Sequence, residues 1–132
     1  HIPLILYAPD LIQSGHYQPI MSQIDIAPTL MDILDAAGSE QFFGQSAFSH
    51  HRPPERAFIS NYQELGYYKK GILTVLLPKQ KVESYQVDAV TLATTPAPVD
   101  TQLLNEAIAY YQTAAKAYKT GALKAPYYAK AP

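Results

Sequence analysis

Apolar positions in the first part of the chain follow two different patterns. Residues 2–7 form a near-continuous apolar run, Ile-Pro-Leu-Ile-Leu-Tyr, which is typical of a strand covered on both faces, as in an α/β sheet. Residues 22–38, SQIDIAPTLMDILDAAG, instead place apolar side chains at helical spacing, at Ile26, Leu30, Ile33, Leu34 and Ala37. We therefore expect a buried strand, a loop rich in turn-forming residues and then an amphipathic helix.

The expected helix has recognisable ends. Asp25 is a predicted N-cap, because its carboxylate can accept hydrogen bonds from the free amides of the first turn and suits the helix dipole. Pro28 falls in the first turn, where its missing N–H costs little. Gly38 suits the left-handed residue that closes a helix, while Asp32 and Asp35 are expected to face water.

From residue 56 the chain consists of short segments rich in β-branched and aromatic residues. They read RAFISNYQ, LGYYKKG, ILTVLLPKQK and VESYQVDAVTL, and turn-forming residues separate them, which favours four antiparallel strands. The preceding segment, residues 42–55, contains two adjacent prolines that disfavour both a helix and a central strand. We therefore place a boundary here: residues 1–54 form the end of an α/β core, and residues 55–132 form an antiparallel α+β subdomain.

A long helix is predicted from Asp100 to about Thr120, with Asp100 as its cap and Gly121 as its stop. Its apolar side chains form one stripe, made of Leu103, Leu104, Ala107, Ile108, Tyr111, Ala115 and Tyr118. The segment TTPAPVD introduces this helix. The predicted fold class is thus α/β: one sheet strand and a helix, followed by a small four-stranded antiparallel sheet with a packed C-terminal helix.

Composition narrows the possible functions. The 132 residues suit a single domain, and 10 basic against 11 acidic side chains give no basic field of the kind that holds nucleic acid. The chain has no cysteine, which excludes disulfides and thiolate metal sites. No apolar run approaches the roughly 20 residues of a membrane span.

Candidate chemical groups in the chain are few, and each has a structural interpretation. His16 is expected to be exposed in a loop, and the adjacent His50 and His51 lack a carboxylate at metal-ligand spacing. The turn residues Lys69 and Lys70 are interpreted as solvated, and the acidic residues as turn, cap and helix-surface positions: Asp10, Asp25, Asp32 and Asp35. Core packing explains most of the tyrosines, among them Tyr67, Tyr85, Tyr111 and Tyr118. The sequence contains no GxSxG, HExxH, P-loop or GxGxxG motif, so we predict no catalytic and no metal-binding residue in this chain.

Three segments in order nevertheless resemble a known family. Pro3-Leu4-Ile5-Leu6-Tyr7-Ala8-Pro9, then Ser22 through Gly38, then Phe43-Gly44-Gln45-Ser46 are similar to the closing portion of the sulfatase-like branch of the alkaline phosphatase superfamily. Within that branch the closest resemblance is to lipoteichoic-acid synthases and phosphoglycerol transferases. Residues 56–88 and the long helix resemble the antiparallel subdomain with which those enzymes end.

The resemblance implies a carboxy-terminal portion of a metal-dependent phospho- or sulfo-ester transferase or hydrolase that is inactive alone. In the family the nucleophile and the Asp-His ligands of a divalent metal (Mn, Zn, Mg or Ca) precede the first strand, so none maps onto this chain. His1, at the mouth of that strand, is the residue expected to contact the anionic group of the substrate. The implied partners are the rest of the same polypeptide and a phosphate-diester or sulfate-ester substrate, such as an anionic lipid headgroup. The implied location is the periplasmic side of a bacterial inner membrane.

A second hypothesis belongs to a different class of function. The same pattern of strands and helices suits a non-catalytic α+β module that binds a partner through its antiparallel sheet. A strand ending in Asp-His upstream of His1 in the reading frame would favour the enzyme, whereas a start codon or linker there would favour the module.

Overall fold

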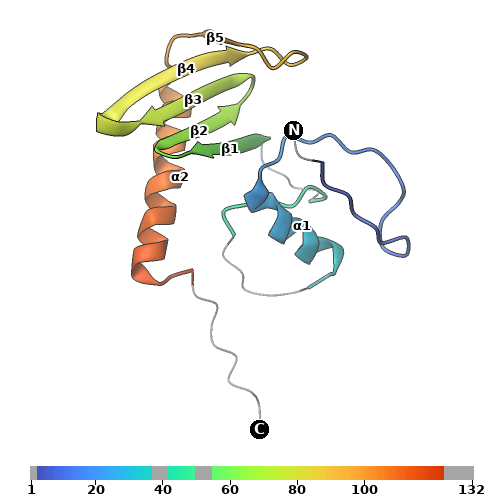
Figure 1. The fold of residues 1–132 in the computed structure, drawn as a ribbon. Coiled ribbons are helices and arrows are strands. Elements are labelled where there is room, and N and C mark those ends of the chain that lie inside the picture. Colours follow the sequence, from blue (N-terminus) through green and yellow to red (C-terminus); the bar gives the residue numbers. More distant parts are fainter. Residues whose placement is uncertain (1–2, 37–41, 50–54, 124–132) are drawn as a thin grey trace.

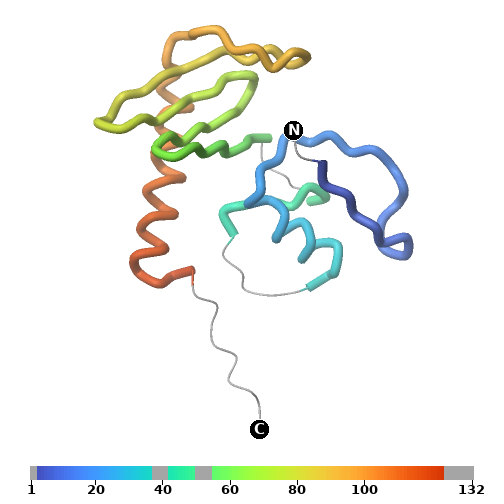
Figure 2. Tube along the Cα trace, viewed as in Figure 1, coloured from blue at the N-terminus to red at the C-terminus, as the bar shows by residue number. Residues whose placement is uncertain are grey.

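A computed structural model describes residues 3–36, 42–49 and 55–123. The described chain forms two parts (Figures 1 and 2). Residues 3–36 and 42–49 contain the short helix α1, and we call them the α1 unit. Residues 55–123 contain a five-stranded sheet and the long helix α2, and we call them the sheet unit. In Figure 1, α1 lies beyond the β1 edge of the sheet, and α2 crosses one face of the sheet and continues past the same edge.

The first helix forms, but it is shorter than the sequence predicts. A 3-10 turn, η1 (Gln23–Asp25), leads directly into α1 (Ile26–Ile33), and Pro28 lies in the first turn of α1 as expected. The helix ends at Ile33, and Asp35 takes a left-handed conformation with φ of 46°. The predicted end at Gly38 lies outside the described residues.

The predicted buried strand at residues 2–7 is wrong for its described part. Residues 3–7 carry no regular secondary structure, and the sheet order β1-β2-β3-β4-β5 does not include them. Ile5 is 87% exposed and Tyr7 is 91% exposed. The physical reason is that a strand needs a neighbour for its ladder of hydrogen bonds, and none of the described strands pairs with this segment. The loop expected before the helix is present.

The four predicted strands of the sheet are confirmed, and a fifth is added. Each strand pairs antiparallel with the next in sequence, and their bounds are β1 (Arg56–Asn61), β2 (Glu64–Lys69), β3 (Ile72–Leu77), β4 (Lys81–Val87) and β5 (Thr94–Pro96). Lys70 and Gly71 connect β2 and β3 with φ of 53° and 79°, the positive values that suit a two-residue hairpin turn. The unpredicted β5 is a three-residue exposed edge strand that ends in proline, so neither length nor pattern marks it.

Helix α2 (Thr101–Thr120) has the predicted ends. The Asp100 side chain accepts hydrogen bonds from the backbone N–H groups of Gln102 and Leu103, and Gly121 closes the helix with φ of 72°. The predicted apolar stripe is partly wrong: Leu103 and Ala107 are buried, but Tyr111 is 59% exposed and Tyr118 is 80% exposed. The ring of Tyr110 takes the predicted place of Tyr111 in the core.

The core of the sheet unit lies between α2 and one face of the sheet. Tyr67, Leu103 and Ala107 form its centre, and partly buried apolar residues surround them: Phe58, Ile72, Leu76 and Tyr110. On the same face, Thr74 and Ser84 are buried next to each other in register. Their hydroxyls find no hydrogen-bond partner among the described residues. This face of the sheet is therefore buried, although it is not uniformly apolar.

Candidate functional site

The motif that begins at Ser22 folds around the carboxylate of Asp25. The backbone N–H of Ser22 donates to Oδ2 of Asp25 at 2.8 Å, and the backbone N–H of Asp25 donates to the carbonyl oxygen of Ser22 at 2.9 Å. Asp25 does precede α1, but its side chain caps none of the first-turn amides of that helix. Asp25 therefore occupies the predicted N-cap position. Its carboxylate does not accept from the amides of α1 but from the N–H of Ser22, in a capping box of η1, and from tertiary contacts.

Those tertiary contacts come from two segments far away in the sequence. The backbone N–H of Gln45 donates to Oδ1 of Asp25 at 2.8 Å. Nη1 of Arg56, the first residue of β1, lies 2.9 Å from Oδ1 and 3.0 Å from Oδ2. The exposed fractions of the two side chains are 3% for Arg56 and 0% for Asp25, so this is a fully buried ion pair. Hydrogen bonds between ionised groups are shorter and stronger than neutral ones, and here they join the α1 unit to the sheet unit.

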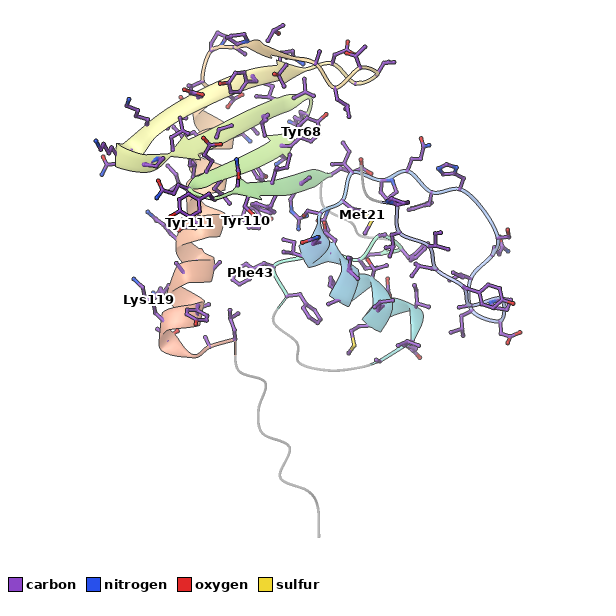
Figure 3. All side chains as sticks on the ribbon, in the orientation of Figure 1. Met21, Phe43, Tyr68, Tyr110, Tyr111 and Lys119 are labelled. Atoms are coloured by element: carbon purple, nitrogen blue, oxygen red, sulfur yellow. The ribbon has the colours of Figure 1, made fainter. Side chains whose placement is uncertain are left out.

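Arg56 makes further contacts on both sides of this junction. Its Nη2 donates to the carbonyl oxygen of Phe43 at 3.0 Å. Its guanidinium also lies 5.2 Å from the ring centre of Phe58 and 5.8 Å from that of Tyr110, within the range of a cation–π contact. Figure 3 labels Phe43 and Tyr110. A single planar cation thus contacts the carboxylate before α1, the loop at residues 42–48, β1 and α2.

The loop at residues 42–48 is closed onto the start of α1. A Cβ atom on Gly44 would lie 1.9 Å from the carbonyl oxygen of Ile24, so only glycine fits this position. The hydroxyl of Thr29 donates to the carbonyl oxygen of Asp25 at 2.6 Å and accepts from the backbone N–H of Ala47 at 3.0 Å. The hydroxyl of Ser46 donates to the Asp32 carboxylate. The segment Phe43-Gly44-Gln45-Ser46 therefore has a structural role in this chain.

A second polar cluster lies where α2 meets the sheet. Oε2 of Glu106 accepts from the hydroxyl of Tyr67 at 2.7 Å and from Nζ of Lys69 at 2.6 Å, and Oε1 accepts from Nε2 of Gln102 at 3.2 Å. Burial raises the pKa of Tyr67, and the hydrogen bond to Glu106 adds to the shift. Burial opposes ionisation of Glu106, but the donors Lys69, Tyr67 and Gln102 together hold its pKa below the ordinary value. The interpretation of Lys69 as a solvated turn residue is therefore wrong, whereas Lys70 is exposed.

The histidines do not contribute to either cluster. His1, His50 and His51 lie outside the described residues, so the substrate contact predicted for His1 stays a prediction. His16 is exposed as expected, and its Nε2 is 3.1 Å from the side-chain nitrogen of Gln18. Within residues 3–36, 42–49 and 55–123, no three side chains of His, Cys, Asp or Glu gather in a group that could hold a metal ion. Neither α1 nor α2 combines the length and apolar character that a membrane-spanning helix needs.

One feature of the sequence points to the Asp25–Arg56 pair, although the spacing of apolar residues does not. Arg56 opens its strand directly before an apolar run, Ala-Phe-Ile. Arginine is almost never fully buried unless it is paired, so a cation at the start of a core strand calls for a carboxylate partner. The pattern gave no means of choosing that partner among the acidic residues upstream.

Comparison with known proteins supports the fold. No protein-family model and no curated protein matches the sequence. Among solved structures, the chain is similar to a crystal structure of a protein in the alkaline phosphatase superfamily from Vibrio parahaemolyticus, with a TM-score of 0.70 and 25% sequence identity. The match covers 77% of this chain but only 25% of that protein, so the chain spans about a quarter of its relative. The predicted fold class, a mixed α/β fold like a portion of that superfamily with an antiparallel sheet and a C-terminal helix, is confirmed.

Proposed function

We propose that this chain is the carboxy-terminal portion of a metal-dependent phospho- or sulfo-ester transferase or hydrolase, of the phosphoglycerol transferase or sulfatase type. Two observations support the proposal. The chain has the fold of one quarter of a protein in the alkaline phosphatase superfamily. Its three motif segments also occur in the order that the sulfatase-like branch shows. In this proposal the chain supports a catalytic core that other residues of the same polypeptide complete.

The exposed apolar surface of the α1 unit is the observation that carries the proposal. Ile5 is 87% exposed, Leu30 on α1 is 40% exposed, and Leu34 directly after α1 is 64% exposed. The fully buried side chain of this helix is the polar Thr29, so the described residues cover the predicted apolar stripe only in part. An amphipathic helix normally turns such a stripe toward a core. A surface of this kind suits burial against further protein.

In this proposal the catalytic machinery belongs to residues outside the described part of the chain. The divalent metal implied by the resemblance requires several oxygen or nitrogen ligands, and the described side chains offer no suitable group. We infer from the resemblance that the metal ligands and the nucleophile precede His1 in the same polypeptide. A contact between His1 and the anionic group, an anionic lipid headgroup as substrate and a periplasmic location remain parts of the same proposal.

The test compares this chain with the product of its complete reading frame. Both are assayed with bis(p-nitrophenyl) phosphate and p-nitrophenyl sulfate, with and without manganese. We expect metal-dependent release of p-nitrophenol by the complete product alone, and a His1→Ala variant of that product should show a higher KM. Turnover by the 132-residue chain that a substitution inside it abolishes would contradict the proposal, as would a reading frame without an Asp-His segment before His1.

The alternative, a partner-binding α+β module, has one observation in its favour. Across the five strands, on the face opposite α2, a row of paired residues is largely apolar: Ala57, Tyr68, Leu73, Tyr85 and Pro96. Figure 1 shows no helix over this face, and Tyr68, Leu73 and Tyr85 are half-buried. Substitution of Tyr68 by Ser should leave ester turnover by the complete product unchanged under the first proposal. Loss of binding to a partner protein, with no esterase activity in the complete product, would favour the module.

A further inference from the structure

We propose that Arg56 and Asp25 form a latch that fixes the orientation of the α1 unit relative to the sheet unit. The inference concerns the mechanics of this chain and does not depend on the proposed function. It rests on two features of the structure, the convergence of contacts on the ion pair and the weakness of the other contacts between the units.

The convergence is geometric. Asp25 receives hydrogen bonds from its own unit, from the N–H groups of Ser22 and Gln45, and from Arg56 in the other unit. Arg56 in turn is held on its own side by the rings of Phe58 and Tyr110. Because each member of the pair is fixed within its unit, the contact between them has little freedom to adjust and defines one relative orientation.

The loop at residues 42–48 makes the latch cooperative. Gln45 donates to Asp25, and the carbonyl oxygen of Phe43 accepts from Arg56, so the same loop contacts both members of the pair. Gly44 allows the backbone between them to approach Ile24 closely. Loss of the Asp25 carboxylate therefore removes the anchor of the loop as well as the partner of the cation.

Outside the ion pair, the described helices and strands of the two units make little contact with one another. Helix α1 packs closely against η1 and only marginally against α2 or any strand. The backbone N–H of Ile20 donates to the carboxylate of Glu55 at 3.2 Å, but this contact is exposed to solvent. The sheet unit also has a core of its own around Tyr67, which involves no residue of the α1 unit. We therefore expect the sheet unit to keep its internal structure while the angle between the units changes, as in a hinge.

Distance measurements between spin labels test the latch directly. The chain has no cysteine, so labels can be attached to cysteines introduced at chosen sites. One pair, Ala27→Cys with Gln112→Cys, spans the two units, and a reference pair, Asn61→Cys with Gln112→Cys, lies within the sheet unit. All three positions are exposed. Double electron–electron resonance then gives the width of each distance distribution.

We expect a narrow distribution for the spanning pair in the otherwise unchanged protein. In Asp25→Asn and in Arg56→Met its width should at least double, while the reference pair stays narrow and circular dichroism shows unchanged helix content. The matched control, Lys69→Met, breaks an ion pair inside the sheet unit and should leave both distributions narrow. A spanning distribution that stays narrow in Asp25→Asn and Arg56→Met would overturn the inference. Broadening of both pairs with loss of helix would also overturn it, because the ion pair would then maintain the whole fold rather than the orientation of its parts.

Discussion

Replacement of Asp25 by leucine leaves the guanidinium of Arg56 in a site where its side chain is only 3% exposed. A buried ion that loses its partner destabilises a protein by about 3–5 kcal/mol, because its desolvation is no longer offset. The contacts that remain to Arg56 compensate only in part, since a cation–π contact contributes about 0.5–2 kcal/mol. We therefore expect the unpaired guanidinium to contribute about 3 kcal/mol to the loss of unfolding free energy in Asp25→Leu, and the unpaired carboxylate to contribute a similar amount in Arg56→Met.

The double variant separates the coupling from the cost of each single change. With both charges replaced by apolar groups, no ion remains buried, and such replacements are often close to neutral. The N–H groups of Ser22 and Gln45 still lose their acceptor, and each unsatisfied buried group costs about 1–3 kcal/mol. Asp25→Leu alone carries the same cost of about 3 kcal/mol for these two N–H groups, in addition to the cost of the unpaired cation. We therefore expect the two single variants to lose about 9 kcal/mol in sum and the double variant about 3 kcal/mol, which gives a coupling energy of about 6 kcal/mol.

Urea unfolding followed by circular dichroism measures all four proteins of this cycle, and an unchanged m-value shows that the unfolded state is comparable. The Lys69–Glu106 pair supplies a control cycle, since its side chains are 13% and 26% exposed. For that more hydrated pair we expect a coupling of about 1 kcal/mol or less. Additivity within about 0.5 kcal/mol for Asp25 and Arg56 would refute the reasoning, because it would mean that the two charges do not interact in the folded protein.

Four further predictions concern single positions. Tyr110→Ala removes a ring from the aromatic core and should cost about 3 kcal/mol in thermal unfolding, whereas Tyr111→Ala, at an exposed position, should change stability by less than about 0.5 kcal/mol. Gly44→Ala puts a Cβ atom 1.9 Å from a backbone oxygen of η1, so the loop must move and limited proteolysis there should accelerate. Thr74→Val removes a buried hydroxyl that has no partner in the described structure, and should raise the free energy of unfolding in urea by about 1 kcal/mol. The pKa of Glu106 is lowered in the folded state, so as the pH falls the unfolded chain takes up this proton before the folded protein does, and the stability that the carboxylate contributes is lost. Glu106→Gln should therefore flatten the part of a stability–pH curve that lies below the ordinary pKa of a glutamate.

The parts of the fold that the sequence predicts well are those that local forces determine. Helix α2 has an aspartate before its first turn and a glycine after its last, and both take the expected roles. The turn between β2 and β3 likewise lies at Lys70 and Gly71, and the positive φ of Gly71 is a conformation that glycine adopts readily. For these elements the interactions that set the ends lie within a few residues, so the pattern contains the necessary information.

The errors come from interactions that link distant residues. The local sequence around Asp25 predicts that its side chain caps the helix. In the structure its carboxylate instead accepts hydrogen bonds from Arg56, 31 residues away, and from the backbone N–H of Gln45. Tyr110 and Tyr111 are adjacent on α2, about 100° apart around the helix axis, and periodicity alone cannot choose between two tyrosines when the stripe has some width. The ring that faces Phe58 and Tyr67 is selected by the sheet.

The structure also changes what the motif resemblance can mean. Three of the motif residues have a structural role: Asp25 pairs with Arg56, Thr29 bridges to Ala47, and Gly44 leaves room for a carbonyl oxygen. The packing of the loop at residues 42–48 onto the start of α1 requires these residues. We therefore expect the same pattern in any protein with this packing, whether or not that protein catalyses a reaction. The resemblance therefore supports the fold more strongly than the chemistry. It follows that substitutions within this junction should change stability and orientation, and that the test of ester transfer has to be made on the complete reading frame.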